Sequence, residues 1–318
     1  HSLLVTSGTN ALLASLMAAG VGPGDEVIIP AYTFVATATA VLSAGAIPII
    51  ANIDEQLGID PIDIKNKISD KTKAIIAVHM DGLSCKIEQV VELSKENGLI
   101  LIEDCCQALG GKYEDKFLGT FGDFGCYSLN KDKVLTAGEG GIVACKTRAD
   151  FEKLLCISDA GYPYGEFESR GIDNIKPFIG LSMRVSEITG VMMLAQIKKL
   201  PEITKQHKIR KNLLVEYLKN SKQFDLIKSE SPAGDCSVKL HLRFKSAEAC
   251  QKIGKLLRDH KILVYPPFIR RAHVAWKWMH MFGEQSEIDP RRNPYNLTES
   301  SSSSSLINSH KLLLSSPS

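Results

Sequence analysis

The sequence predicts an α/β protein with a large, mostly parallel sheet covered by helices, followed by a smaller α+β region. Short apolar runs alternate with helical patterns through the first two-thirds of the 318 residues. These runs are continuously apolar, as in strands that are buried on both faces of a parallel sheet. Beyond residue 222 the elements become half-exposed and amphipathic. We therefore expect a large domain over residues 1–205 and a small C-terminal domain over residues 206–318.

Each element follows from the same patterns. Strands are expected where short apolar runs meet turn or polar residues, at 2–6, 25–30, 47–53, 73–80 and 99–104. Helices are expected between them, at 10–20, 37–45 and 86–98. A further pair of strands is expected at 124–130 and 140–146. A long helical stretch, interrupted near Pro201, is expected over 184–220. The last third predicts a strand at 237–244, a helix at 246–261, a strand at 262–267 and a flexible serine-rich loop at 300–305.

The composition excludes several classes of protein. Apolar residues make up 44% and charged residues 23% of the chain, and the formal net charge is +2. That balance gives no reason to expect a nucleic-acid partner. No apolar run is long enough to span a membrane, and no secretory signal pattern is present. The eight cysteines are scattered and form no CxxC pair, so we expect reduced thiols, no metal site and a cytoplasmic protein.

The segment "SGTNALLASL" brings Ser7, Gly8 and Thr9 from a strand to the start of a helix. Free backbone N–H groups, two hydroxyls and the positive end of the helix dipole make an anion site there. Simple helix capping by Ser7 explains the same residues equally well. In a parallel sheet, however, ligands bind at the carboxyl ends of strands, where this segment is expected to lie.

The segment "LIEDCCQALGG" places Asp104 at the end of a buried strand, with Gln107 three residues later. A buried acid is costly without a partner, and the protonated ring nitrogen of a bound heterocycle is one such partner. The alternative is a helix-capping aspartate beside a surface glutamine. Cys105 and Cys106 are expected to pack as small apolar residues.

The segment "CYSLNKDKVLTAGEGG" contains two lysines, Lys131 and Lys133, between a strand and a glycine cluster. The glycines allow the backbone to fold tightly behind Ser128 and Lys133. A lysine amine held in an apolar site is a nucleophile that can form a Schiff base. The alternative for any single lysine is a solvated loop residue.

These pieces together describe one cofactor. A phosphate cradle, an aromatic ring from "PAYTF" at 30–34, an acid for a pyridinium nitrogen and a lysine for an aldehyde are the partners of pyridoxal 5'-phosphate. We therefore predict a protein that depends on this cofactor.

The sequence also resembles a known family. The motifs "TSGTNAL", "GDEVIIPAYTFVAT", "AVHMDG", "IEDCCQALGG", "GTFGDFGCYSLNKDKVLTAGEGG" and "GLSMRVSEITGVMMLAQIKKL" are similar to those of the DegT/DnrJ/EryC1/StrS sugar aminotransferases, in the family's order and spacing. The resemblance spans nearly the whole chain and is most specific over 103–141. It implies the type I aminotransferase fold and a homodimer whose active sites lie at the subunit interface.

Matched by motif, the resemblance gives each candidate residue a role. It implies that Lys133 is the Schiff-base lysine, that Asp104 is the partner of the pyridine nitrogen and that Lys131 is solvated. The remaining cofactor contacts it implies are Gln107 near the phenolic oxygen, Phe34 as the stacking ring, and Gly8, Thr9, Asn10 and Ser128 at the phosphate.

Three features depart from the family pattern. Ser182 stands where relatives carry an asparagine that reaches the partner subunit's phosphate, so we expect a weaker or water-mediated contact there. Ala160 stands where many relatives carry histidine, which predicts a reshaped substrate pocket. Relatives also carry several dozen residues before the first strand, in a region that helps cover their active site. We expect either that this segment is missing from the sequence or that the protein is naturally short.

The leading functional prediction is an aminotransferase that moves an amino group from an amino acid, glutamate, to a keto-sugar in amino-sugar biosynthesis for surface polysaccharide or a secondary metabolite. Three motifs resemble enzymes of the family that aminate C8 of 3,8-dideoxy-8-oxo-octulosonate. One alternative is a sugar dehydratase on the same fold, in which histidine replaces the lysine; Lys133 counts against it. Another is a regulatory relative that binds the cofactor without turnover, as the late start and Ser182 would allow.

Overall fold

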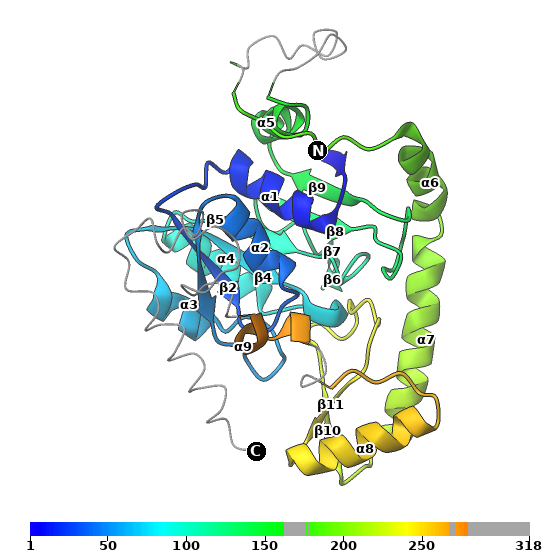
Figure 1. The fold of residues 1–318 in the computed structure, drawn as a ribbon. Coiled ribbons are helices and arrows are strands. Elements are labelled where there is room, and N and C mark those ends of the chain that lie inside the picture. The colour runs from blue at the N-terminus through cyan, green and yellow to red at the C-terminus, as the bar shows by residue number, and fades with distance from the viewer. Residues whose placement is uncertain (162–175, 177, 267–270, 279–318) are drawn as a thin grey trace.

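The computed structural model describes residues 1–161, 176, 178–266 and 271–278. A seven-stranded sheet lies at its centre, in the order β1-β9-β8-β5-β4-β2-β3 (Figure 1). The strands are β1 (Ser2–Val5), β2 (Glu26–Pro30), β3 (Ile47–Ala51), β4 (Thr72–Val78), β5 (Ile100–Asp104), β8 (Phe124–Ser128) and β9 (Gly141–Cys145). The five neighbouring strands from β8 to β3 pair in parallel, and β9 is antiparallel to both of its neighbours, β1 and β8. The predicted α/β class with a mostly parallel sheet is confirmed.

Helices cover both faces of this sheet, and the strand residues alternate between two cores. One core combines side chains such as Val27 and Ile76 with helices on one face, and the other combines Ile28 and Ile75 with helices on the opposite face. Successive residues of a strand point to opposite faces, so a continuously apolar strand fills both cores. The first face carries α1 (Gly8–Ala18), α2 (Ala36–Ser43) and α5 (Arg148–Ser158), and the second carries α3 (Pro61–Lys67) and α4 (Ile87–Glu96).

The C-terminal part begins with two helices along one side of the molecule (Figure 1). These are α6 (Glu187–Ile197) and α7 (Leu200–Leu218). Pro201 lies in the first turn of α7, where its missing N–H costs nothing, so it starts this helix. Because α7 runs unbroken through residue 205, one helix connects the two regions on either side of the predicted boundary. The division at residue 205 stays a prediction.

A small antiparallel pair of strands and a helix follow α7. They are β10 (Phe224–Ile227), β11 (His241–Phe244) and α8 (Ala247–Asp259). The chain then returns to the large sheet, where Val35 N donates to Ala272 O over 2.7 Å. The remaining short elements are η1 (Met80–Gly82), β6 (Lys112–Tyr113), β7 (Lys116–Phe117), η3 (Arg271–His273) and α9 (Ala275–Trp278).

One predicted strand is wrong. Residues 262–266 form no strand, and Leu263 is 81% exposed. The run "ILVYPP" is apolar, but Pro266 has no N–H to donate, and the small sheet described here consists of β10 and β11 alone. The serine run at 300–305 lies outside the described residues. Within the described part of the chain, no helix combines the length and apolar character needed to cross a membrane.

Candidate active site

A pocket of about 870 Å³ lies where parallel strands of the large sheet end. Its residues come from the start of α1, the loop before α2, the ends of β4, β5 and β8, the loop between β8 and β9, and three places in the C-terminal part of the chain. Open parallel sheets bind their ligands at this edge, outside the carboxyl ends of the strands. The predicted site residues that line it are Gly8, Thr9, Phe34, Asp104, Gln107, Ser128 and Lys133.

The first turn of α1 forms one part of the pocket. Ser7 is the N-cap, and its hydroxyl accepts a hydrogen bond from Asn10 N at 3.1 Å. Ser7, Gly8 and Thr9 also line the pocket, so capping and anion binding can occur together. A Cβ on Gly8 would lie 2.7 Å from Cys106 Sγ and 2.9 Å from Ser128 Cβ. Glycine is therefore required for β8 to approach this turn.

Asp104 lines the pocket at the end of β5 and is only 5% exposed. Its Oδ2 accepts a hydrogen bond from Thr37 Oγ1 at 2.9 Å, and its Oδ1 accepts one from Cys106 N at 3.0 Å. Thr37 lies 2.7 Å from the hydroxyl of Thr33. The carboxylate is thus fixed in orientation by two groups and still faces the pocket.

Lys133 lies in the loop between β8 and β9. Its N–H donates to Asn130 O at 3.1 Å, and the loop is closed by a bond from Leu129 N to Gly140 O at 2.9 Å. Gly140 has a φ of 149°, in the region that favours glycine. Lys131 instead points to solvent, 74% exposed, in an ion pair with Asp132 at 2.9 Å. The two lysines of this loop therefore differ in environment, since Lys133 lines the pocket and Lys131 is exposed.

Two further side chains complete the middle of the pocket. Phe34 is 43% exposed, and the centroid of its ring lies 5.2 Å from that of His273. Gln107 Nε2 lies 3.5 Å from Met80 Sδ. An exposed aromatic ring in a pocket can stack on a flat ligand, and an amide can bind a polar substituent of that ligand.

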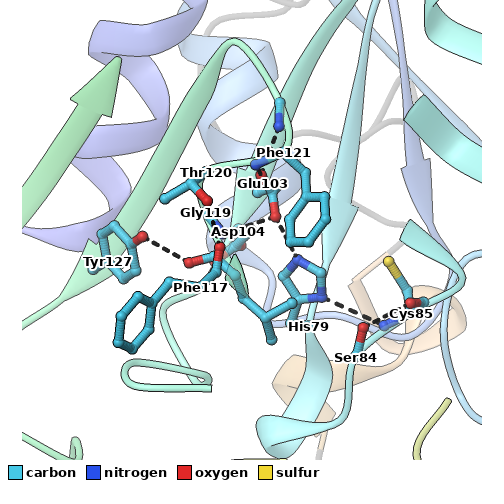
Figure 2. A network of polar contacts seen from close by, with 12 residues as sticks. His79, Ser84, Cys85, Glu103, Asp104, Phe117, Gly119, Thr120, Phe121 and Tyr127 are labelled. Carbon is cyan, nitrogen blue, oxygen red and sulfur yellow. Dashed lines mark hydrogen bonds and ion pairs between the residues drawn. The ribbon is translucent and has the colours of Figure 1, made fainter. Parts of the chain in front are cut away.

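Behind the pocket lies a separate buried network around Glu103 and His79 (Figure 2). Glu103 Oε2 lies 3.0 Å from His79 Nε2, and the carboxylate also accepts from the backbone N–H groups of residues 119, 121 and 122 at 2.6–2.7 Å. Burial acts to raise the pKa of Glu103, but its hydrogen bonds lower the pKa. For His79, burial acts to lower the pKa, but the neighbouring groups, beginning with Cys85 and Cys105, raise it well above 6.5.

Comparison with known proteins places this chain in a family. Residues 1–292 match the model of the DegT/DnrJ/EryC1/StrS aminotransferase family. The chain belongs to that family. It is 36% identical over 234 residues to the GDP-perosamine synthase of Escherichia coli O157:H7, covering 70% of this chain and 62% of the relative. The chain spans between 51% and 62% of the length of the first three curated relatives that it matches.

Solved structures of similar proteins share the fold of this chain. A crystal structure of 3-amino-5-hydroxybenzoic acid synthase has 26% identity and a TM-score of 0.73, covering 81% of this chain and 68% of that one. An E. coli GDP-4-keto-6-deoxy-D-mannose-3-dehydratase with bound hydrated PLP has 22% identity and a TM-score of 0.75, covering 84% and 73%. The predicted fold is confirmed: the chain has the fold of the family's PLP-dependent enzymes.

Three residues singled out by the family pattern lie away from the pocket lining. Asn10 turns back to Thr6, with Nδ2 donating to Oγ1 at 2.6 Å. Ser182 is exposed and forms an isolated bridge with Asp159. Ala160 is exposed with a φ of 61°. The roles predicted for them stay predictions.

The structure also adds residues that the sequence did not point to. Thr37, Asp81 and Lys239 are the main ones: Thr37 holds Asp104, and the other two form an ion pair at the pocket wall. Asp81 follows His79 by two residues, and only its position after a strand could have drawn attention to it. Lys239 lies 106 residues beyond Lys133 in an apparently ordinary alternating segment, so no local pattern marks it.

One group of side chains has atoms suited to a metal. The ligand atoms of His79, Glu103 and Cys105 lie within 4.8 Å of one another. Glu103, however, already accepts hydrogen bonds from His79 and the backbone, and burial raises the pKa of Cys105 to about 12, which keeps its thiol protonated. This group fits a closed hydrogen-bonded network.

Proposed function

We propose that this chain forms the cofactor and substrate site of a pyridoxal 5'-phosphate-dependent aminotransferase that moves an amino group from L-glutamate to a keto-sugar. The observation that carries the proposal is a single pocket lined by a helix N-terminus, a buried aspartate and a loop lysine: Gly8–Thr9, Asp104 and Lys133. Each of these fits a different part of the cofactor.

The fit can be followed from one end of the cofactor to the other. The first turn of α1 and Ser128 line one end of the pocket, and backbone N–H groups and hydroxyls at a helix start can bind a phosphate. Phe34 supplies a ring face, and Gln107 an amide for the phenolic oxygen. Asp104, held by Thr37 and Cys106 N, would keep a proton on the pyridine nitrogen. When bound, the cofactor supplies an aldehyde and an electron-accepting ring.

The chain's own residues supply the proton chemistry. Lys133 Nζ would hold the cofactor at its aldehyde, and the same amine would be placed to take a proton and return it. The surrounding loop restricts its movement through the backbone bonds of Asn130 and Leu129. Asp104, whose orientation is fixed by Thr37 and Cys106 N, would face the ring of the bound cofactor.

The substrate classes rest on the relatives. The names of several describe sugar or cyclitol amination, including GDP-perosamine synthase and an L-glutamine:2-deoxy-scyllo-inosose aminotransferase of Micromonospora echinospora that is 34% identical over 226 residues. Lys133 supports transfer of an amine over dehydration, because the dehydratases of this fold carry histidine there.

The buried thiols and balanced charge also support the cytoplasm as the location of the protein.

Borohydride trapping tests the role of Lys133. Protein mixed with the cofactor should absorb visible light, and borohydride should fix the cofactor to the peptide that contains Lys133. Lys133→Ala should abolish this labelling. Lys131→Ala is the matched control, because Lys131 lies in the same loop but points to solvent, and it should label normally. Labelling of Lys131 would overturn the assignment.

We further propose that the active unit is a homodimer and that Ser182 acts across its interface. Helices α6 and α7 expose large apolar side chains, which is unusual for helices that face water. Among them, Ile188 is 72% exposed, Leu194 66% and Leu213 60%. Ser182 lies on the segment just before α6 and is exposed. A second copy covering this face would bury those side chains.

Changing Ser182 tests this arrangement. Serine donates one hydrogen bond where asparagine donates two, and a neutral hydrogen bond contributes about 0.5–1.5 kcal/mol. Ser182→Asn should therefore tighten cofactor binding by roughly tenfold at most, and Ser182→Ala should loosen it by a similar or smaller factor. Both effects should fade at dilutions where the dimer dissociates. Sedimentation of a monomer with full cofactor affinity would contradict the proposal.

A further inference from the structure

The pocket has a second lysine, Lys239, on a wall that the cofactor residues do not supply. Among the described residues that line the pocket, Lys133 and Lys239 are the two lysines. Lys239 precedes β11, so it comes from the C-terminal part of the chain. If Lys133 is committed to the cofactor, Lys239 is the other ammonium group of this pocket lining that a substrate can meet.

Asp81 holds this ammonium group in place. Lys239 Nζ forms an ion pair with Asp81 Oδ1, and Asp81 Oδ2 lies 3.3 Å from both Tyr32 Oη and His241 Nε2. The Asp81 side chain is 1% exposed, whereas that of Lys239 is 29% exposed. Both side chains line the pocket, and that of Lys239 is the more exposed of the two.

An aromatic ring also orients the ammonium group. Lys239 Nζ lies 5.4 Å from the ring centroid of Tyr265, which lines the pocket too. Lysine side chains lose much conformational freedom on binding a ligand, and contacts that already restrict them reduce this cost. Asp81 and Tyr265 thus give Lys239 a defined place before any substrate arrives.

We propose that Lys239 is a specificity-determining residue that binds a carboxylate of the substrate. This inference rests on the proposed function, since it names the substrate chemistry of the same pocket. A carboxylate can come from the amino-acid donor or from an acceptor that is a sugar acid. In either case an ammonium group recognises it by a charge-assisted hydrogen bond.

The test compares probes that carry a carboxylate with counterparts that lack one. The acceptor pair is 5-keto-D-gluconate and L-sorbose, and the donor pair is L-glutamate and 2-aminopentane-1,5-diol. Affinity is measured by calorimetry on the full chain, with and without pyridoxal 5'-phosphate. The visible absorbance of the cofactor, recorded first, reports on the proposed function. The charge dependence of probe binding reports on Lys239 whether or not the cofactor loads.

Lys239→Met should weaken binding of a carboxylate probe by about 10- to 100-fold, the value of one charge-assisted hydrogen bond, and leave binding of the counterpart without a carboxylate unchanged. Lys239→Arg, which keeps the charge, should recover most of the affinity. A loss confined to L-glutamate identifies the donor as the source of the carboxylate, and a loss confined to 5-keto-D-gluconate identifies the acceptor. Both results support the proposal.

Lys211→Met is the matched control. Lys211 pairs with Asp235 and, like Lys239, ties the segment before β11 to another part of the chain, but it does not line the pocket. It should leave all four probes unchanged. The proposal is overturned if Lys239→Met changes the binding of neither carboxylate probe, if it weakens probes with and without a carboxylate equally, or if Lys211→Met reproduces its effect.

Discussion

Glu103 and Asp104 are neighbouring acids on β5 that occupy different environments. Glu103 is fully buried and its carboxylate is satisfied by His79 and three backbone N–H groups. Asp104 is nearly as buried, yet it lines the pocket and is held by Thr37 and Cys106 N. Successive strand residues point to opposite sides, which separates the two. Burial alone therefore does not mark a functional acid; the cavity it faces does.

The largest effect is expected from Glu103→Gln. Removing one partner of a buried ion pair leaves the other charge uncompensated and costs about 3–5 kcal/mol. Glu103 also anchors the 119–122 loop, so we expect a loss of that size in the free energy of unfolding, measured by urea denaturation. An unchanged midpoint and slope would show that the network does not stabilise the fold.

Asp104→Asn should give the opposite result, with an intact fold and impaired chemistry. Asparagine keeps the shape but cannot hold a proton on the pyridine nitrogen, and loss of such electrostatic stabilisation costs roughly 10²- to 10³-fold in rate. The rate of the half-reaction with L-glutamate is the measurement. Asp123→Asn is the control, because Asp123 binds Leu101 N outside the pocket lining. Unimpaired rates in Asp104→Asn would mean that this acid only caps a turn.

A smaller effect is expected from Thr37→Val, which removes the hydroxyl that donates to Asp104 at 2.9 Å. A hydrogen bond to a charged group contributes about 1.5–3 kcal/mol, so the half-reaction should slow by roughly tenfold or more, yet less than in Asp104→Asn. Thr39→Val provides the control, since Thr39 in the same helix donates to Val35 O instead. Equal effects of the two variants would remove Thr37 from the site.

The smallest expected effect is a change with pH in the free energy of unfolding, and it tests the Glu103–His79 pair alone. The lowered pKa of Glu103 adds stability that is present above its ordinary value of 4.5 and is lost as the pH falls through the folded-state pKa. The raised pKa of His79 adds stability that is full below 6.5 and is lost as the pH rises through its folded-state pKa. The double variant His79→Gln/Glu103→Gln has neither group. The difference in unfolding free energy from the unchanged protein should therefore be largest between pH 4.5 and 6.5. A difference that does not vary with pH would contradict the directions of these shifts.

The sequence predicted the sheet and one side of the pocket because their signals are local. Apolar runs marked strands such as β4 and β5, and polar residues just after strands marked Asp104 and the start of α1. The strand expected at 262–267 failed because an apolar run does not reveal whether a neighbouring strand exists to pair with it. Pro266 also has no backbone N–H, so a strand there would have one fewer hydrogen bond to donate.

The other wall of the pocket could not be predicted from local patterns. Lys239 meets Asp81 across 158 residues, and Glu103 meets His79 across 24. The sequence shows the charges but not which of them the fold brings together. It gave no sign of the hydrogen bonds that Glu103 makes with His79 and with the 119–122 loop.

The most direct test of the central claim is the absorption spectrum of the cofactor-loaded protein before and after addition of L-glutamate. The account predicts a visible band that L-glutamate replaces with the shorter-wavelength band of the aminated cofactor, with 2-oxoglutarate formed in equal amount. Lys133→Ala should show neither change. A visible band that persists unchanged with L-glutamate, in protein that binds the cofactor, would contradict amine transfer in this pocket.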